Sequence, residues 1–237
     1  MRFGPSTSLS HLELKDNRLH SLLEITNAIN ANLPIEQLYK IFSFILKEQL
    51  SFHRFLLLMH QDEWQLATKN GIKGKIDAHQ LATELERFRE ITLVASSNSA
   101  LLQGFQAVIP ISHQEKPLAY LLLSTLGKTE SLEPAHFSFA QTLTNILTVA
   151  IENQRLVKQH LIKERISKEL EVASEMQRML FPQELPSNRK MDLSGKYIPR
   201  HAIGGDYYDF IPLGDEEYII CIGDVSGKGI SAAMLMA

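Results

Sequence analysis

The feature that most constrains the fold is a stretch from residue 135 to residue 181 that contains neither glycine nor proline. It is rich in Leu, Lys, Glu, Gln and Arg, which are strong helix formers, so it predicts one continuous helix. About 45 residues at a rise of 1.5 Å each would span about 65 Å. Because this exceeds the diameter of a small domain, the helix cannot bury its full length against one domain of its own chain.

Apolar residues recur along this helix at spacings of three and four, which is typical of a narrow apolar stripe. The stripe consists of two sets that are out of phase near residues 161–162. They are Leu143, Leu147, Ala150, Val157 and Leu161, followed by Ile162, Ile166, Leu170, Ala173, Met176 and Leu180. This pattern favours a parallel two-stranded coiled coil with a second copy of the chain, in which the phase shift acts as a stutter. The other interpretation is that the helix folds back on the preceding domain.

The residues before this helix predict an α+β domain with an antiparallel sheet. Helical periodicity covers residues 19–33 and the segment that begins at Pro34. Apolar runs then predict two hairpins with a polar helix between them. The expected strands are residues 54–60 and 62–68 in the first hairpin and 104–112 and 117–125 in the second, and the polar helix spans residues 79–88.

This order of elements resembles a GAF domain, a small-molecule sensor and dimerisation module, over residues 19–155. The resemblance implies a possible small-molecule ligand, but neither a cysteine for a bilin nor a cyclic-nucleotide signature occurs in this segment. Four aromatic residues are candidates to line a ligand pocket, and core packing is the alternative role for each of them. They are Phe55, Trp64, Phe105 and Tyr120.

Composition excludes several classes of protein. The net charge of −3 is too small for general binding to nucleic acids or anionic membranes, and no apolar stretch reaches the roughly 20 residues of a membrane span. No apolar leader follows the N-terminus, so we expect a cytoplasmic protein. The nine His residues show no metal-ligand spacing, and Cys221, the one cysteine, is expected to be a small buried residue in a strand.

Two Gly-Asp pairs flank a predicted hairpin near the end of the sequence, in "GGDYYDFIPLGDEEYIICIGD". If paired positions sum to 430, Asp206 lies opposite Asp224, with their Cβ atoms about 5 Å apart on one face. Two such carboxylates repel each other, and a hard cation such as Mg²⁺ or Mn²⁺ would offset this better than a shared proton. A slip of one residue would put the two on opposite faces. The turn is expected at residues 213–216.

The following "GDVSGKGISA" has other interpretations. It contains a G-x-G-x-x-A pattern typical of dinucleotide sites, but a hairpin precedes it and not a parallel crossover. It also fails as a phosphate-binding P-loop, because Gly229 follows Lys228 where Ser or Thr is required. Gly227 and Gly229 could simply shape the turn into a helix, which is compatible with an adjacent metal site.

Three motifs together are similar to the bacterial SpoIIE/RsbU-type branch of the PPM (PP2C-like) serine/threonine phosphatases. They are the A-x-x-x-Q-x-x-L-x-P pattern of Ala173, Gln177, Leu180 and Pro182, then "GGDYYDF", then "GDVSGKGISAAMLMA". The resemblance implies a two-metal centre of Mn²⁺ or Mg²⁺. Asp206 and Asp224 would be its catalytic metal ligands, with Asp224 bridging and the backbone carbonyl of Val225 as a further ligand. Asp209 falls on the other face of its strand, and Lys228 either attracts phosphate or is a solvated turn charge.

The sequence therefore divides into a flexible N-terminus (1–18), a GAF-like sensor domain (19–155), a helical linker (156–186) and the beginning of a phosphatase domain (187–237). The last part would be an incomplete PP2C-like α/β sandwich, because the family takes further metal-binding aspartates from sequence that is absent here. We expect this chain to be an inactive form of a signal-regulated phosphatase. Its substrate would be a regulatory phosphoprotein such as an anti-sigma factor antagonist. The alternative is a non-catalytic GAF sensor and dimerisation module.

Overall fold

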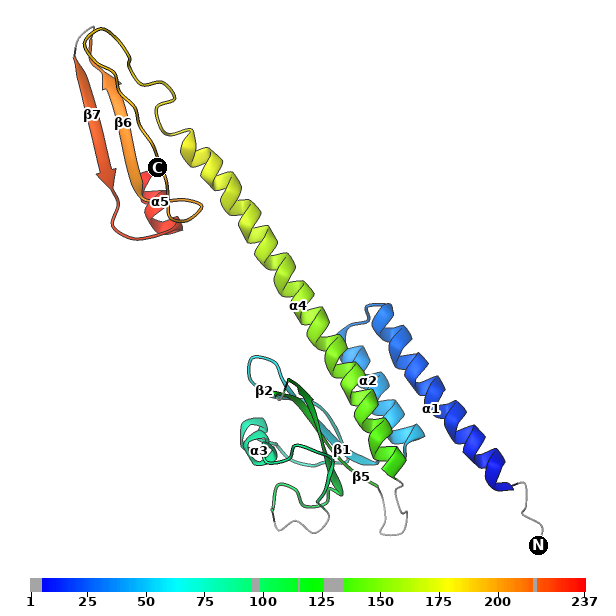
Figure 1. Ribbon diagram of the computed structural model, residues 1–237. Coiled ribbons are helices and arrows are strands. Elements are labelled where there is room, and N and C mark those ends of the chain that lie inside the picture. Colours follow the sequence, from blue (N-terminus) through cyan, green and yellow to red (C-terminus); the bar gives the residue numbers. More distant parts are fainter. Residues whose placement is uncertain (1–5, 95–98, 115, 126–133, 215–216) are drawn as a thin grey trace. The chain divides into compact units, whose positions relative to one another are not determined.

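The computed structural model describes residues 6–94, 99–114, 116–125, 134–214 and 217–237 (Figure 1). The chain divides into two compact units, Met1–Arg155 and Leu156–Ala237. The helix α4 (Pro134–Arg178) contributes residues to both units. Each unit is considered below by itself.

The N-terminal unit is built around an antiparallel sheet in the strand order β2-β1-β5-β4-β3. Two helices come first, α1 (Ser6–Asn30) and α2 (Ile35–Phe44), and α2 continues directly into a π-helical turn, η1 (Ile45–Gln49). The helix α3 (Ala78–Leu85) lies between β2 and β3 in the sequence, and Asp77 caps its N-terminus by accepting hydrogen bonds from the backbone of His79 and Gln80. The strands are β1 (Arg54–His60), β2 (Trp64–Asn70), β3 (Thr92–Leu93), β4 (Ala107–His113) and β5 (Lys116–Ser124).

Both faces of this sheet are buried, and alternate residues of each central strand serve the two faces. In β1, Phe55 and Leu57 pack in the core beneath α1, α2 and the first part of α4, whereas Leu56 and Leu58 pack in a second core beneath α3. Figure 1 shows this layering, with α1, α2 and α4 on one side of the sheet and α3 on the other. The run "FLLLM" is therefore continuously apolar because both of its faces are covered.

The observed element order confirms the predicted α+β domain: two helices, a hairpin, a helix, a second hairpin and an exit helix. Two short elements were not predicted, namely β3 and η1, because neither is long enough to show a period. The predicted turn between β4 and β5 includes residue 115, which lies outside the described residues.

The segment 1–18, for which the sequence predicted flexibility, contains the start of α1 at Ser6, and its flexibility stays a prediction. Proline is absent from residues 6–30, and the first half of that range contains three Leu together with Glu13, Lys15 and Arg18. These residues favour a helix even where the local sequence is polar. Residues 1–5 lie outside the described part of the chain.

The long helix predicted from the glycine- and proline-free stretch is confirmed as α4, which spans 45 residues. Its apolar stripe has two different environments. Leu143, Leu147 and Ala150 are buried in the core of the N-terminal unit, so the first turns of α4 do pack on the domain. Six later members of the stripe are exposed in this single chain: Val157, Leu161, Ile162, Ile166, Met176 and Leu180. The coiled coil itself stays a prediction.

None of the helices in the described ranges is both long enough and apolar enough to cross a membrane.

A partly buried tyrosine, Tyr39, makes the stability of the N-terminal unit sensitive to alkaline pH. Burial, together with the nearby charge of Glu36, raises the pKa of Tyr39 to about 12, and its hydroxyl donates to Sδ of Met59. An unfolded tyrosine ionises near pH 10, so between about pH 10 and 12 the unfolded chain releases a proton that the folded chain retains.

We therefore expect the free energy of unfolding to fall as the pH rises through this window. Tyr39→Phe should make the fall shallower, as measured by urea unfolding from pH 9 to 11.5. Equal slopes for the wild type and the variant would contradict the assignment to Tyr39.

Candidate metal site on the C-terminal hairpin

The C-terminal unit carries an antiparallel hairpin of β6 (Asp206–Pro212) and β7 (Tyr218–Asp224), followed by the helix α5 (Ile230–Met236). Asp206 pairs with Asp224, Tyr208 with Ile222 and Phe210 with Ile220. This is the predicted register, in which paired positions sum to 430. The two aspartates therefore share one face at the open end of the hairpin. Of the predicted turn, residues 215 and 216 lie outside the described residues.

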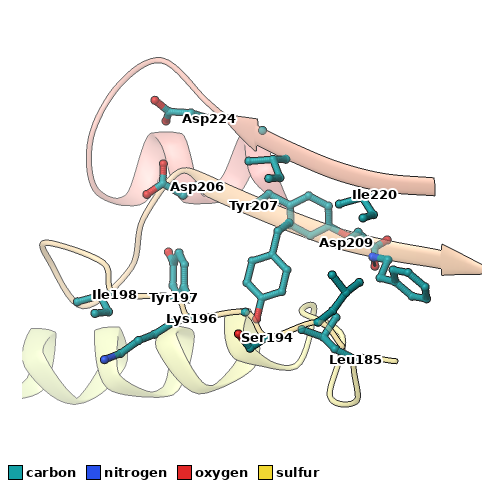
Figure 2. Close-up of a pocket in the computed structure, with 16 residues that line it drawn as sticks. Leu185, Ser194, Lys196, Tyr197, Ile198, Asp206, Tyr207, Asp209, Ile220 and Asp224 are labelled. Carbon is teal, nitrogen blue, oxygen red and sulfur yellow. Dashed lines mark hydrogen bonds between the residues drawn. The ribbon is translucent and has the colours of Figure 1, made fainter. Parts of the chain in front are cut away.

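A groove of about 830 Å³ runs along this face of the hairpin. Asp206 and Asp224 lie at one end of it, and both side chains are exposed. Figure 2 shows the two carboxylates side by side, with Tyr197 and Lys196 on the opposite wall. Tyr208, Phe210, Ile220 and Ile222 supply the apolar floor of the groove. The groove therefore combines a doubly anionic end with an apolar surface.

The segment before Asp206 lies very close to the segment after Asp224. A Cβ atom on Gly205 would lie 2.8 Å from the carbonyl oxygen of Val225 and 2.9 Å from Cβ of Ala232 in α5, so only glycine fits. The backbone N–H of Val225 donates to the carbonyl oxygen of Gly205 at 3.2 Å. This contact extends the hairpin beyond its last pair, directly next to the two aspartates.

The other candidate residues lie away from this end of the groove. Asp209 also lines the groove, three residues along β6 from Asp206, where it pairs with Cys221, and its carboxylate accepts a hydrogen bond from the backbone N–H of Phe210 at 2.7 Å. Lys228 is exposed and lines a separate hollow of about 400 Å³ with Leu170 of α4 and Ile203. Gly227 and Gly229 have positive φ angles of 129° and 65°, and they form the turn into α5.

The expected burial of Cys221 was wrong, because this cysteine is exposed. Its strand is apolar, which suggested a buried β-strand. In the described residues, however, much of β7 is open: Ile219, Ile220 and Ile222 are also exposed. An apolar run identifies a strand but does not say whether anything covers it.

The sequence missed the role of Gln177, although it is part of the quoted motif. Its side chain is only 6% exposed. Its Nε2 donates to the carbonyl oxygen of Gly204 at 2.8 Å, and its Oε1 accepts from the N–H of Gly204 and from the hydroxyl of Tyr197, both at 3.2 Å. Burial, with the charge of Asp206 as the second cause, raises the pKa of Tyr197. The only available signal was a polar residue between apolar stripe positions.

The four aromatic pocket candidates of the N-terminal unit are not brought together. Phe55 packs in the core beneath α1, α2 and α4. Trp64, Phe105 and Tyr120 pack in the core beneath α3, where the rings of Trp64 and Tyr120 have centroids 5.2 Å apart. They therefore serve as core residues, which is the alternative that the sequence left open.

The donor set at the hairpin fits a hard divalent cation only in part. Carboxylate and carbonyl oxygens are the ligands that Mg²⁺ and Mn²⁺ prefer, and Asp206, Asp224 and Val225 offer them at one end of the hairpin. Among the residues that the structure describes, no group of three or more His, Cys, Asp or Glu side chains is placed to hold a metal ion. The arrangement can therefore contribute to a cation site but does not complete one.

Comparison with known proteins gives partial matches. No protein-family model matches the chain. Protein IcfG of Synechocystis sp. (strain ATCC 27184 / PCC 6803 / Kazusa) is 38% identical over 68 residues, and the phosphoserine phosphatase RsbU of Bacillus subtilis (strain 168) is 38% identical over 77 residues. The matches cover 29% and 32% of this chain but only 11% and 22% of those relatives. The chain thus spans less than a quarter of either curated relative.

Among solved structures, a GAF domain from Pseudomonas syringae pv. tomato aligns with a TM-score of 0.51 at 16% identity. The alignment covers 66% of this chain and 99% of that domain. The chain therefore contains a GAF fold, as predicted. At this identity, the likeness concerns the fold alone.

Proposed function

We propose that this chain provides the sensor domain and part of the catalytic centre of a metal-dependent protein serine/threonine phosphatase. The observation that carries the proposal is the register that sets Asp206 opposite Asp224 at the end of the groove. Two anions on neighbouring strands repel each other, and a divalent cation relieves that repulsion. The partial similarity to RsbU, which is named a phosphoserine phosphatase, supports the same activity.

In this proposal Asp206 and Asp224 hold Mn²⁺ or Mg²⁺, with Asp224 as the bridging ligand of a two-metal centre and the carbonyl oxygen of Val225 as a further ligand. When bound, such cations polarise a phosphoryl oxygen and lower the pKa of the attacking water. Lys196 lines the same groove and would attract the negative charge of a phosphoryl group. The remaining ligands of a complete centre are not among the described residues.

The proposed substrate is a cytoplasmic regulatory protein that carries phosphoserine or phosphothreonine, such as an anti-sigma factor antagonist. Both aspartates are exposed, so a phosphorylated loop of a folded protein can reach them. The apolar floor of the groove, with Phe210 and Ile220, offers contact for the residues around the phosphate.

The direct test is a titration of the chain with Mn²⁺ followed by nuclear magnetic resonance (NMR), because this ion broadens nearby signals. The signals of residues 205–207 and 223–225 are expected to broaden first. Broadening that begins elsewhere, or that is uniform along the chain, would contradict the proposed site.

A second candidate function is sensing and dimerisation without catalysis. It is favoured by the GAF fold and by the exposed apolar residues of α4 after residue 156. Both candidate functions are compatible with a small-molecule ligand of the GAF domain.

Dimerisation through α4 makes a specific prediction. Ile166 belongs to the apolar stripe and is 50% exposed in the single chain. Ile166→Lys would put a charge into the seam of the proposed coiled coil and should convert the dimer to a monomer at micromolar concentration, as measured by light scattering. Ser167→Lys is the matched control, because this exposed neighbour lies about 100° away around the helix. A wild-type monomer, or a dimer that survives Ile166→Lys, would exclude this interface.

A further inference from the structure

The C-terminal end of α4 is joined to the segment that carries Asp206 by one buried side chain. Gln177 lies on the second-to-last residue of the helix, and its amide faces the backbone of Gly204, two residues before Asp206. The amide donates to the carbonyl oxygen of Gly204 and accepts from the N–H of the same residue. It therefore satisfies both backbone groups of Gly204, as a neighbouring β-strand would.

The packing around this contact leaves the segment little freedom. A Cβ atom on Gly204 would lie 2.6 Å from the hydroxyl oxygen of Tyr197, and that hydroxyl also donates to Oε1 of Gln177. The ring of Tyr197 packs against Phe181 with centroids 4.5 Å apart. Gly204 is thus confined by Tyr197 and Gln177, while Gly205 is confined by Val225 and Ala232.

We propose that Gln177 is a positioning residue that holds the Gly204–Asp206 segment against the last turn of α4. When the last turn of α4 is helical, Gln177 holds the segment in place, and the Asp206 carboxylate lies opposite Asp224. This proposal rests on the proposed metal site for its functional meaning, but the positioning itself does not. Because α4 begins in the sensor domain, a change that orders or frays its end would reach the metal site through one amide group.

The physical basis is the asymmetry between a made and a broken hydrogen bond. Removal of the amide leaves the N–H and C=O of Gly204 without their partner at a site that is only half exposed. The segment would then relax toward water, and Asp206 would move with it. A packing change alone would not single out these backbone groups.

The first test measures amide hydrogen exchange by NMR in the full chain without metal. Gln177→Met retains the side-chain volume and removes all three hydrogen bonds. The variant should raise the hydrogen-exchange rates of the backbone amides of residues 204–206 by about two- to tenfold. This is the range expected when an amide loses one hydrogen bond. The rates in β7 and α5 should stay unchanged.

Gln183→Met is the matched control. Gln183 lies just beyond the same helix end and donates to the carbonyl oxygens of Arg178 and Phe181, but it does not contact Gly204. This variant should leave the exchange at residues 204–206 within twofold of the wild type. Faster exchange throughout residues 197–237 in Gln177→Met, or no change at Gly204, would overturn the positioning role.

The link to the helix has its own test. Glu171 is exposed and lies about two turns before Gln177 on α4. Glu171→Gly should lower the equilibrium constant for helix formation at this position by about three- to fivefold. It should speed exchange at Gly204 in the wild-type background but add little in the Gln177→Met background. Equal effects in both backgrounds would show that the segment does not depend on the helix through Gln177.

The final test connects positioning to the metal. Gln177→Met should weaken Mn²⁺ binding by about 10–100-fold, as loss of a group that orients a ligand typically does, whereas Gln183→Met should not. If the wild type shows no Mn²⁺ binding at Asp206 and Asp224, the proposed function fails, and the exchange data alone decide the role of Gln177. If Mn²⁺ binds but Gln177→Met leaves its affinity unchanged, the metal site stands and the positioning role is overturned.

Discussion

Asp206→Ala is expected to abolish the localised broadening by Mn²⁺ and to lower the proposed phosphatase activity more than about 100-fold. Loss of a group that merely supports a metal ligand costs 10–100-fold in metal affinity or activity, so loss of a ligand should cost more. Asp224→Ala should have at least the same effect, because the proposed bridging role would make it a ligand of both cations. Metal binding is followed by NMR, and activity by the release of phosphate from a phosphoserine peptide.

Asp209→Ala is the matched control for this prediction. It removes a carboxylate from the same strand, three residues away, but one that pairs with Cys221 and not with Asp224. Mn²⁺ binding and activity should stay within about threefold of the wild type, because a surface charge at that distance is screened by salt. If Asp209→Ala and Asp206→Ala lost Mn²⁺ binding and activity equally, binding would depend on the total charge of the hairpin and not on the pair Asp206 and Asp224. If neither had an effect, the metal site would not be at this hairpin.

Leu147→Ala is expected to lower the free energy of unfolding of the N-terminal unit by about 2–5 kcal/mol. Leu147 lies on α4 and is 0% exposed, in the core between the helices and the sheet. Its truncation removes apolar contacts and leaves a cavity that a close-packed core cannot fully close. For a unit of this size the melting temperature should fall by about 4–20 °C in a thermal unfolding experiment followed by circular dichroism.

Leu156→Ala makes the same chemical change nine residues later on the same helix. Leu156 is 50% exposed and does not belong to the predicted stripe, so the expected change is within about 0.5 kcal/mol. Comparison of the two variants separates burial from any change in helix propensity, because both replace Leu by Ala in α4. Similar losses in both variants would contradict the assignment of the effect to burial, because Ala favours the helix at least as much as Leu does.

Much of the local structure could be predicted from the sequence, since it depends on residues close together along the chain. Helix propensity and the absence of glycine and proline were sufficient for α4. Alternation of side chains and a short connection favoured the register that pairs Asp206 with Asp224. A one-residue slip would have moved every side chain of β7 to the other face, and the structure shows the register without that slip.

Burial could be predicted less well, because it depends on what packs against an element. Cys221 and Leu57 both lie in apolar strands, yet Leu57 is covered and Cys221 is exposed. The four aromatic candidates likewise looked equivalent in the sequence. The sheet separates Phe55 from the other three, because they face opposite cores. Neither outcome follows from a local pattern.

The sequence by itself determined most of the secondary structure, because helices and strands follow from side-chain period and helix propensity, and it offered the pairing of the two aspartates as one of two registers. Only the tertiary structure decided that Gln177 contacts Gly204, 27 residues further along the chain. It also decided which part of the α4 stripe is buried. Such contacts depend on the close approach of backbones and on the shape of the space between packed elements, and the order of residues does not encode these directly.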